Sequence, residues 1–340
     1  MWEKRIYIYV ILVSLLLSSC DNNITENVII DNEYVFRQNE KLGVGVNLGN
    51  ALEAPNEGDW GVVIKDEYFD IIKNLGFNSI RIPVKWSAHL TQNNQIDEIF
   101  MKRVEYVVDL GLKKGFAIIL NVHHFDEIHI DPISNKQKLY DIWQQISKKF
   151  SNRSNYLFYE VLNEPQNNLT INLWNDIQKE CVRIIRENDK YHTILVSGVN
   201  YNSVWGLENL SLPEDNNIIL TIHYYEPFTF THQGAEWVNG ADVWLGTKWL
   251  NTEPEIQNIE ADINKAVNFA KLHNIPVNCG EFGSYYKADS LSRVNWTNAI
   301  ATILKKNKIS YNYWEFCAGF GFYDPNTKKI NYSLVNALLK

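Results

Sequence analysis

Short apolar segments alternate with amphipathic segments along most of this chain, and this alternation constrains the fold more than any single motif. We predict strands at residues 44–48, 79–84, 116–122, 156–162, 193–197, 218–225, 276–281 and 310–315. The amphipathic segments that we predict as helices include residues 65–75, 99–113, 140–150, 173–188, 256–273 and 291–306. Near-continuous apolar strands separated by helices indicate a parallel sheet that is buried on both faces. Eight such repeats favour an α/β fold that closes on itself, a single-domain (β/α)8 TIM barrel.

An open, doubly wound sheet is the alternative fold for the same alternation. That fold usually carries a glycine-rich phosphate loop directly after its first strand. Here Gly43 and Gly45 precede or open the first predicted strand, and Gly49 follows it without the three-glycine fingerprint. The barrel is therefore the preferred prediction.

The amino-terminal segment has the pattern of an export signal. Lys4 and Arg5 precede an apolar run over residues 6–17, and Leu-Ser-Ser-Cys ends at Cys20. This ending resembles a bacterial lipobox, in which Cys20 is lipidated and becomes the mature amino terminus. We predict a lipoprotein signal over 1–20, a polar, asparagine-rich tether over 21–38 and a catalytic domain over 39–340. The protein is then an exported cell-surface or periplasmic lipoprotein that meets the membrane only through its lipid anchor.

Charge and cysteine content exclude several classes of protein. The net charge is −8, and the sequence shows no basic cluster, which argues against nucleic acid as a partner. Besides Cys20, the chain has Cys181, Cys279 and Cys317, and three thiols cannot pair completely. A bridge between Cys279 and Cys317 stays open, although buried free thiols are favoured. We expect a monomer.

Polar and titratable side chains stand at the ends of most predicted strands. In a parallel barrel these ends meet at one rim, where barrel enzymes place their chemistry. The sequence therefore predicts one site at this rim, built from Arg81, His123, His124, Asn163, Glu164, His223, Tyr225, Glu281 and Trp314.

Two glutamates of this set suit the hydrolysis of a glycosidic bond. One carboxylic acid protonates the leaving oxygen, while one carboxylate attacks or stabilises the sugar cation. Glu164 and Glu281 follow strands four and seven and should face each other across the barrel mouth. Their pKa values must differ for these roles. We expect the positive charge of Arg81 to keep Glu281 ionised, and the charge of Glu281 to help Glu164 keep its proton.

Other carboxylates compete for these roles. Glu160 lies within strand four and is predicted to be structural, while Glu226 follows strand six. Glu315 follows Trp314 directly, so strand alternation should point it away from a cleft that Trp314 faces.

The histidines could also suggest a metal site. His123, His124, His223 and His232 are the candidates. A hydrolytic metal barrel would carry a His-x-His pair on an early strand, where this chain has Asn47. We therefore predict no metal and no cofactor.

The same residues carry a resemblance to a known family. Asn163-Glu164-Pro165 after strand four and Gly-Glu-Phe-Gly at 280–283 resemble the signatures of glycoside hydrolase family 5, over about residues 40–340. Longer tracts at 49–61, 223–225, 231–237 and 313–316 are similar to the endoglucanase and mannanase branch known from thermophilic bacteria.

The resemblance implies a role for each matching residue. Glu281 would be the nucleophile and Glu164 the acid/base of a reaction that retains the anomeric configuration. Arg81 and Tyr225 would hydrogen-bond the nucleophile, Asn163 would bind the sugar 2-hydroxyl and His223 would orient the acid/base. His123 would line the subsite next to the cleavage point, with Trp314 as its platform. The residues of a wider cleft that would touch sugars are Asn50, Glu53, His124, His232 and Trp237.

We therefore predict a retaining endo-β-1,4-glycanase, an endoglucanase that cleaves internal bonds of β-1,4-linked polysaccharides such as glucans and glucomannans. Mainly endo-β-1,4-mannanase activity is one alternative, and a non-catalytic glycan-binding surface lipoprotein is another. The long connection at 226–255 after strand six is expected to contribute to the cleft. Its Trp244 and Trp249 are expected to pack against neighbouring aromatics instead of binding sugar.

Overall fold

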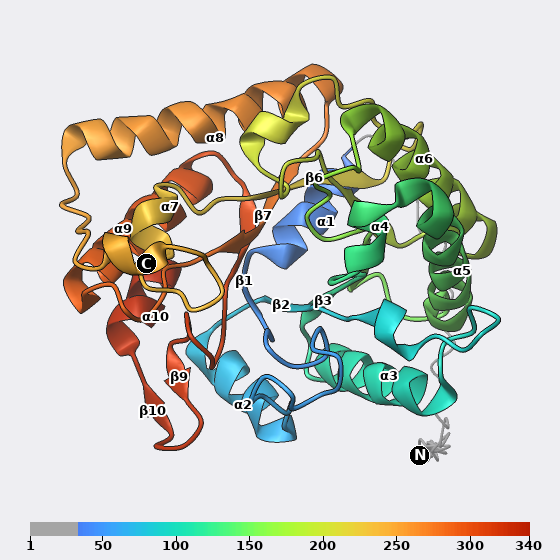
Figure 1. The fold of residues 1–340 in the computed structure, drawn as a ribbon, viewed down its shortest axis with the longest axis horizontal. Coiled ribbons are helices and arrows are strands. Elements are labelled where there is room, and N and C mark those ends of the chain that lie inside the picture. Colours follow the sequence, from blue (N-terminus) through green and yellow to red (C-terminus); the bar gives the residue numbers. More distant parts are fainter. Residues whose placement is uncertain (1–32) are drawn as a thin grey trace, which may run out of the picture.

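The computed structural model describes residues 33–340 (Figure 1). The predicted signal, Cys20 and most of the predicted tether lie outside the described residues, and the lipid anchor therefore stays a prediction.

Eight parallel strands form a closed barrel in sequence order, because β1 pairs with β2 on one side and with β8 on the other. This closure confirms the predicted fold class and rules out the open sheet. The strands are short and stand around the centre of the ribbon in Figure 1. They are β1 (Val44–Asn47), β2 (Ser79–Ile82), β3 (Ala117–Asn121), β4 (Leu157–Glu160), β5 (Thr193–Val196), β6 (Ile218–His223), β7 (Val277–Phe282) and β8 (Ser310–Tyr313).

Helices surround the barrel, and six of them match predicted segments. The α-helices are α1 (Tyr34–Leu42), α2 (Asp66–Leu75), α3 (Glu98–Lys113), α4 (Asp126–Ile130), α5 (Pro132–Phe150), α6 (Ile171–Asn188), α7 (Phe228–Thr231), α8 (Glu253–His273), α9 (Ser290–Lys306) and α10 (Tyr332–Leu339). The connections also hold the 3-10 helices η1 (Trp86–His89), η2 (Val204–Leu207) and η3 (Ala241–Trp244), and a hairpin of β9 (Tyr323–Asp324) and β10 (Lys329–Ile330).

Helix α5 begins earlier than predicted. The sequence pattern placed its start at residue 140, whereas the helix starts at Pro132. Proline suits the first turn of a helix, because its missing N–H would have no partner there. Asp131 caps this turn by accepting the backbone N–H of Ser134.

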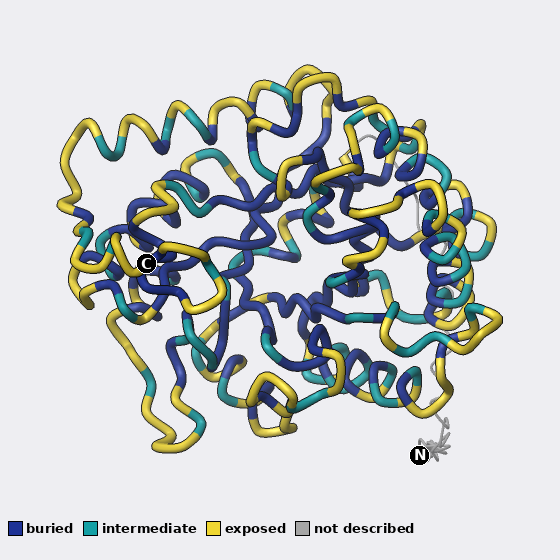
Figure 2. The backbone as a smooth tube through the Cα atoms, viewed as in Figure 1, coloured by how far each residue is buried: buried dark blue, intermediate teal, exposed yellow. Residues whose placement is uncertain are grey.

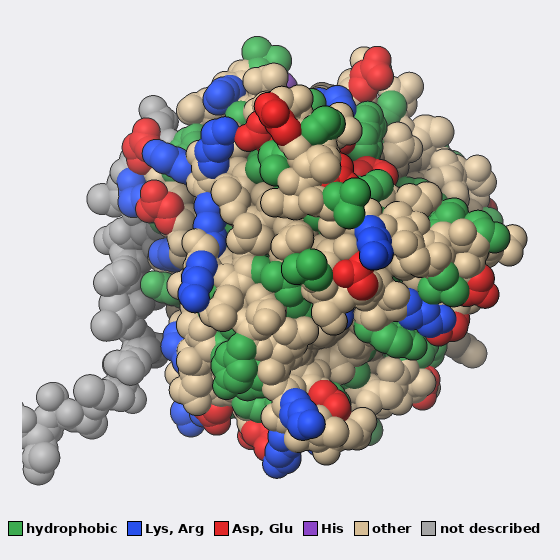
Figure 3. Space-filling view, turned by 90° about the vertical axis from the view of Figure 1, so that its left-hand side faces the viewer, with side chains coloured by type: hydrophobic (Ala, Val, Ile, Leu, Met, Phe, Trp, Pro, Cys, Tyr) green, Lys and Arg blue, Asp and Glu red, His purple; other side chains and the backbone are tan. Residues whose placement is uncertain are grey.

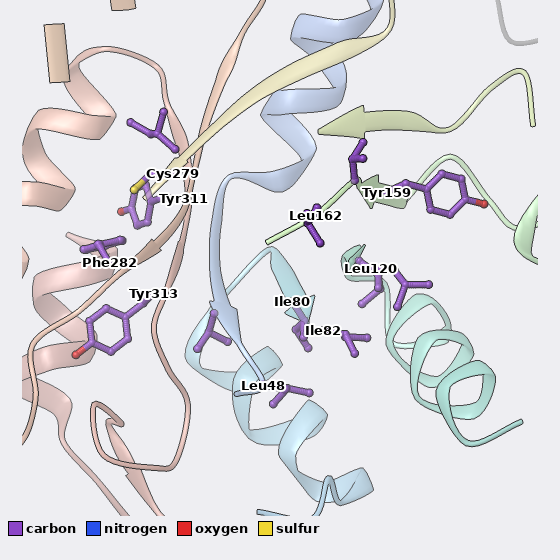
Figure 4. Close-up of a cluster of buried hydrophobic side chains, with 14 of the residues drawn as sticks. Leu48, Ile80, Ile82, Leu120, Tyr159, Leu162, Cys279, Phe282, Tyr311 and Tyr313 are labelled. Atoms are coloured by element: carbon purple, nitrogen blue, oxygen red, sulfur yellow. The ribbon is translucent and has the colours of Figure 1, made fainter. Parts of the chain in front are cut away.

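The core has two layers, which follow from strand alternation. Side chains that point outward pack against the helices, and Figure 4 shows this layer at Ile80, Leu120, Tyr159, Phe282 and Tyr311. In Figure 2 the strands are buried throughout, while exposed segments lie on the outer helices and loops.

The inner layer is closed at its amino-terminal end by α1, which the sequence analysis missed. The predicted tether over 21–38 was wrong for residues 34–38, because these residues form the first half of this helix. Val35 and Leu42 of α1 pack with the inward-pointing Ile119 and Phe158. The helix was not predicted because its buried face includes polar residues. Asn39 is one of them, and it accepts a hydrogen bond from the Ser310 hydroxyl, 2.7 Å away.

The cysteines of the described residues are free thiols. Cys181, Cys279 and Cys317 are all buried. The bridge that the sequence left open between Cys279 and Cys317 is therefore not formed. Burial raises the pKa of all three thiols, so they behave as small hydrophobic side chains.

The surface carries both signs of charge. Figure 3 shows lysine and arginine interspersed with aspartate and glutamate over one face of the molecule. Within residues 33–340 no helix has both the length and the apolar character needed to cross a membrane.

The packing of α1 predicts a measurable effect on stability. Replacing Leu42 with alanine should lower the free energy of unfolding by about 2–4 kcal/mol, because a fully buried side chain is lost at the closed end of the barrel. Urea unfolding followed by circular dichroism measures this change. Glu40→Ala on the exposed face of the same helix is the control and should change stability little. Equal effects of the two substitutions would contradict the closing role of α1.

Candidate active site

A fully buried arginine connects the strand ends. Arg81 of β2 binds both oxygens of Glu160, with Nε 2.6 Å from Oε2 and Nη2 2.7 Å from Oε1. Its Nη1 donates to Oε1 of Glu281 at 2.6 Å and to Oδ1 of Asn47 at 2.9 Å. Its Nη2 also donates to Oδ1 of Asn163 at 2.8 Å. One guanidinium group thus fixes four side chains from the ends of three other strands, β1, β4 and β7.

This arginine remains charged despite its burial. Burial alone would lower its pKa, but the carboxylates of Glu160 and Glu281 outweigh this effect and raise the pKa above its ordinary value. Glu160 lies inside β4 and binds Arg81, which agrees with the structural role predicted for it. Planar guanidinium suits such two-point contact with a carboxylate.

Glu164 and Glu281 lie close together, as predicted. Glu164 sits just after β4 with a φ of 49°, and Glu281 belongs to β7. One oxygen of each carboxyl group and a ring nitrogen of His223 all lie within 4.8 Å of one another. The Tyr225 hydroxyl donates to Oε2 of Glu281 at 3.0 Å.

His223 is in contact with the carboxyl group of Glu164. Its Nδ1 lies 2.9 Å from Oε1 of Glu164 and 3.7 Å from Oε2 of Glu281, and Asn202 contacts its other ring nitrogen at 3.4 Å. Burial lowers the pKa of His223 to about 4, so the ring is neutral at pH 7. A neutral ring can donate to ionised Glu164 or accept from its protonated form, and the contact survives both states.

Burial is the main cause of the pKa shifts of the glutamate pair. It raises the pKa of Glu164 to about 7, where Arg81 opposes the shift and the charge of Glu160 adds to it. Burial also raises the pKa of Glu281, against the lowering effects of His223 and Arg81. The explanation of the two glutamate pKa values from the sequence was therefore incomplete, because it considered the charges of Arg81 and Glu281 and neglected burial.

His123 and Trp314 form a stacked pair beside Glu281. Their rings lie 5.6 Å apart with an angle of 6° between the planes, and Nε2 of His123 is 3.9 Å from Oε1 of Glu281. Gly49 packs against the Trp314 ring so closely that a Cβ atom there would come within 2.9 Å. His124 is next to this pair and meets the half-exposed Trp60 edge-on at 5.4 Å.

Glu53 is turned into its own loop. It is buried and accepts the backbone N–H groups of Asn50 and Ala51. Burial raises its pKa to about 8. Asn50 has a φ of 61°, so Glu53 holds an asparagine-bearing turn at the end of β1. In the structure Glu53 binds this backbone and makes no contact with the Glu164–Glu281 pair.

Glu315 has a similar place in the loop after β8. It is fully buried and accepts the backbone N–H groups of Cys317, Ala318 and Phe320. This contact agrees with the prediction that Glu315 would point away from the cleft.

The long connection after β6 brings His232 and Trp237 towards the site. The His232 ring lies 5.0 Å from the Tyr225 ring and stacks on Phe228 at 4.0 Å. Trp237 is 61% exposed and lies 6.4 Å from His232. These side chains extend an aromatic wall outward from Tyr225.

Two tryptophans of this connection pack against neighbouring aromatics, as expected. Trp244 meets Phe228 edge-on at 6.0 Å. Trp249 is buried and packs against Phe230 at 6.5 Å.

Sequence reasoning missed some residues of the site. Asn47, at the end of β1, binds Arg81. Its position at the end of a predicted strand could have identified it, but it was not included in the predicted site. Asn202 contacts His223 from the loop after β5, and the exposed Trp60 adjoins His124. Neither position could be found from strand ends, because both side chains come from irregular loops.

The glutamate pair also satisfies the distance condition for a metal site. Within residues 33–340, Glu164, His223 and Glu281 are the group whose ligand atoms gather closely enough. The guanidinium of Arg81 already places positive charge 2.6 Å from Glu281 and would repel a cation there. The arrangement therefore suits proton transfer and nucleophilic attack better than metal binding.

Comparison with known proteins identifies the relatives of this fold and site. The family model described as Cellulase (glycosyl hydrolase family 5) matches residues 43–319. Endoglucanase H of Acetivibrio thermocellus is 34% identical over 89% of this chain, which spans 33% of that relative. Endoglucanase C of the same organism is 26% identical, over 87% of this chain and 97% of that protein.

Solved structures show the same similarity. Thermotoga maritima Cel5A in complex with mannotriose is 45% identical with a TM-score of 0.88, over 89% of this chain and 99% of that one. The same protein in complex with cellobiose gives the same identity and TM-score.

The buried charge network predicts an unequal effect of two conservative substitutions. Glu160→Gln should lower the free energy of unfolding by about 3–5 kcal/mol, because it leaves Arg81 buried with one carboxylate fewer. Glu180→Gln, which breaks a solvent-exposed pair with Arg183, is the matched control and should have little effect. Urea unfolding at pH 7 measures both. A Glu160 variant as stable as the control would show that the network does not depend on this pair.

Proposed function

This chain belongs to the cellulase family, glycosyl hydrolase family 5, and on that premise we propose that it is a retaining endo-β-1,4-glycanase. The observation that carries the proposal is the distance between oxygens of Glu164 and Glu281, which lie within 4.8 Å of each other. Carboxyl groups about 5–5.5 Å apart are typical of retaining glycosidases, whereas inverting enzymes need about 6.5–9.5 Å to admit a water molecule.

In the first step, an oxygen of Glu281 attacks the anomeric carbon and forms a glycosyl ester. Arg81 and Tyr225 hold the two oxygens of this carboxylate, which fixes its orientation for attack. Glu164 gives its proton to the glycosidic oxygen, and the bond between this oxygen and the anomeric carbon breaks. A pKa raised to about 7 leaves a large share of Glu164 protonated for this donation near neutral pH, whereas an ordinary glutamate would be almost fully ionised.

In the second step, ionised Glu164 takes a proton from water while the water oxygen attacks the anomeric carbon. The ester bond to Glu281 breaks, and its carboxylate returns to the contacts with Arg81 and Tyr225. Two successive displacements leave the anomeric configuration unchanged. His223 stays in contact with Glu164 throughout, because its neutral ring can pair with both forms of the carboxyl group.

We propose β-1,4-glucan as the main substrate, with mannan or glucomannan also accepted. The similar Thermotoga maritima Cel5A has been solved with cellobiose and with mannotriose, which supports both sugar types. Glucose and mannose differ at C2, and we assign the 2-hydroxyl contact to Asn163, whose amide oxygen is held by Arg81. A single mismatched hydroxyl changes specificity by only a few kcal/mol, so both polymers suit one site.

The proposal predicts a large loss of activity on removal of the nucleophile. Initial rates on soluble cellulose derivative, lichenan, glucomannan, galactomannan and xylan should be highest on the glucans and lowest on xylan. Glu281→Ala should lower these rates at least 10³-fold, on the order expected for loss of a covalent step. Glu214→Ala, an exposed glutamate before β6 at the opposite end of the barrel, should leave them unchanged.

The same assay separates the alternatives. Rates highest on galactomannan would indicate mainly mannanase activity, and loss of rate with a chelator would indicate a metal-dependent hydrolase. Binding of the polymers without cleavage by the unmodified protein would indicate a glycan-binding lipoprotein.

The pKa of Glu164 predicts the basic limb of the pH profile. Above a pH of about 7, Glu164 loses the proton that it must donate, and kcat/KM should fall tenfold per pH unit. An activated aryl cellobioside has a leaving group that needs no proton. The first step of its hydrolysis should therefore not slow down at high pH. Measurement of kcat/KM from pH 4 to 9 on both substrates tests this difference. A polymer profile flat up to pH 9 would contradict the assignment of Glu164 as the acid.

A further inference from the structure

The turn that follows β5 has an unusual backbone conformation close to the catalytic centre. Asn200, Tyr201 and Asn202 are consecutive residues in the left-handed region, with φ of 54°, 62° and 54°. Residues other than glycine usually enter this region singly and not in a run. Strained backbone of this kind persists only where the surrounding structure holds it, and it clusters at active sites. The run therefore marks this turn as a candidate functional element.

Backbone hydrogen bonds fix the turn between Glu164 and His223. The N–H of Tyr201 donates to the carbonyl oxygen of Pro165, the residue after Glu164, at 3.3 Å. The N–H of His223 donates to the carbonyl oxygen of Asn202 at 2.9 Å. The turn thus connects the ends of β4 and β6, which carry the proposed acid/base and the histidine that contacts it.

Two backbone segments cross at the base of the same loop. A Cβ atom at Gly206 would come within 1.9 Å of the carbonyl oxygen of Val199, and one at Gly198 would come within 2.2 Å of the carbonyl oxygen of Gly206. Glycine has no Cβ atom and permits this approach. The loop that carries Asn202 is therefore closed at its base.

The side chain of Asn202 completes the contacts of the His223 ring. Asn202 is fully buried, and its Nδ2 lies 3.4 Å from Nε2 of His223. The other ring nitrogen, Nδ1, lies 2.9 Å from Oε1 of Glu164. Gly280 packs against the Nε2 side of the ring, where a Cβ atom would come within 3.2 Å of this nitrogen. Among residues 33–340, Asn202 is the hydrogen-bond partner that Nε2 has.

The orientation of the Asn202 amide selects one tautomer of this ring. An amide NH2 group only donates, so Nε2 must offer its lone pair, and the proton of the neutral ring must lie on Nδ1. Turning the amide over would leave its NH2 group without an acceptor, at the place where Oδ1 now has no partner in the described part of the chain. Buried N–H groups without a partner are rarer than carbonyl oxygens without one, which favours the present orientation.

We propose that Asn202 is a positioning residue that keeps the proton of the neutral His223 ring on Nδ1. His223 then donates to Glu164 in both of its states, to an oxygen of the ionised form and to the carbonyl oxygen of the protonated form. A donor stabilises the ionised carboxylate more than the neutral acid, so this contact lowers the pKa of Glu164 against the effect of burial. The catalytic consequence rests on the proposed function, whereas the tautomer does not.

The tautomer also decides where the proton of Glu164 can go. With a proton on Nδ1, the ring has no lone pair directed at Glu164 and cannot accept a hydrogen bond from it. The proton of Glu164 is then available for the glycosidic oxygen. His223 orients the carboxyl group without competing for the proton that the first step needs.

Other charged and titratable groups surround this contact and remain in place when Asn202 is replaced. Those that face His223 or Glu164, or act on them through their charge, are Glu281, Arg81, Glu160, His123 and Tyr225. A change that follows replacement of Asn202 therefore reports on the Asn202 contact.

Nitrogen NMR of the histidine rings tests the tautomer directly. In the protein labelled with ¹⁵N-histidine at pH 7, the His223 signals, assigned by their loss in His223→Gln, should show a protonated Nδ1 and an unprotonated Nε2. A neutral ring that carries its proton on Nε2 in the unmodified protein would overturn the proposal.

Replacement of Asn202 tests whether this residue sets the tautomer. Asn202→Gly suits the left-handed backbone and should change the His223 signals to those of a mixture of both tautomers. Asn200→Gly, at an exposed residue of the same turn with the same φ, is the matched control and should leave the signals unchanged. Unchanged signals in Asn202→Gly would overturn the proposal.

The pH dependence of cleavage tests the effect on Glu164. Asn202→Gly removes the fixed donor from the ionised carboxylate, so the basic limb of kcat/KM on lichenan should move to higher pH by about half a unit or more. A residue that only supports the loop would lower the rate and leave the limb in place. A basic limb equal to that of Asn200→Gly would overturn the proposal.

The two proposals fail separately, because the NMR measurement needs no turnover. An unmodified protein that cleaves nothing, but whose His223 tautomer depends on Asn202, would leave this role standing and refute the proposed glycanase activity. An active glycanase whose tautomer does not depend on Asn202 would refute this role alone.

Discussion

The charge of Arg81 is the interaction on which the catalytic end of this barrel depends. A guanidinium group without any exposed surface is stable only when paired and fully hydrogen-bonded. Two carboxylates and two amide oxygens meet that requirement here, and they come from the ends of β1, β4 and β7. The same contacts that make the buried charge tolerable therefore also fix the position of Glu281 and of Asn163.

Glu281 and Glu164 are held by different contacts at this centre. Glu281 is held by a permanent cation and by the Tyr225 hydroxyl, which keeps one carboxylate oriented on a rigid strand. Glu164 sits just past its strand in a left-handed backbone conformation and contacts a neutral histidine. Burial raises its pKa, while Arg81 lies too far to bind it directly. Two glutamates of one rim thus have different surroundings, which is the condition for different roles.

Sequence patterns could predict what depends on alternation and strand ends. The barrel, the glutamate pair and the convergence of Arg81, His223 and Tyr225 all follow from the strand rhythm and from the polar residues that end each strand. The helix α1 could not be predicted, because its buried face includes Gln38 and Asn39, whose burial depends on partners distant in sequence. The direction of Glu53 was equally hidden, since its partners are backbone groups that any sequence supplies. The partial burial of Glu164, which raises its pKa, depends on tertiary packing and leaves no local signature.

The loops that carry Asn50 and Trp314 share a construction with consequences for how this protein can change over evolution. Each loop is tied down by a buried carboxylate, Glu53 or Glu315, that binds main-chain N–H groups. Every amino acid except proline supplies such a group, so most side chains in these loops can be exchanged without altering the path of the backbone. Substitutions in these two loops can therefore create new sugar contacts while the catalytic centre stays in place. Natural selection can retune the polymer preference through such exchanges while the two anchoring glutamates remain.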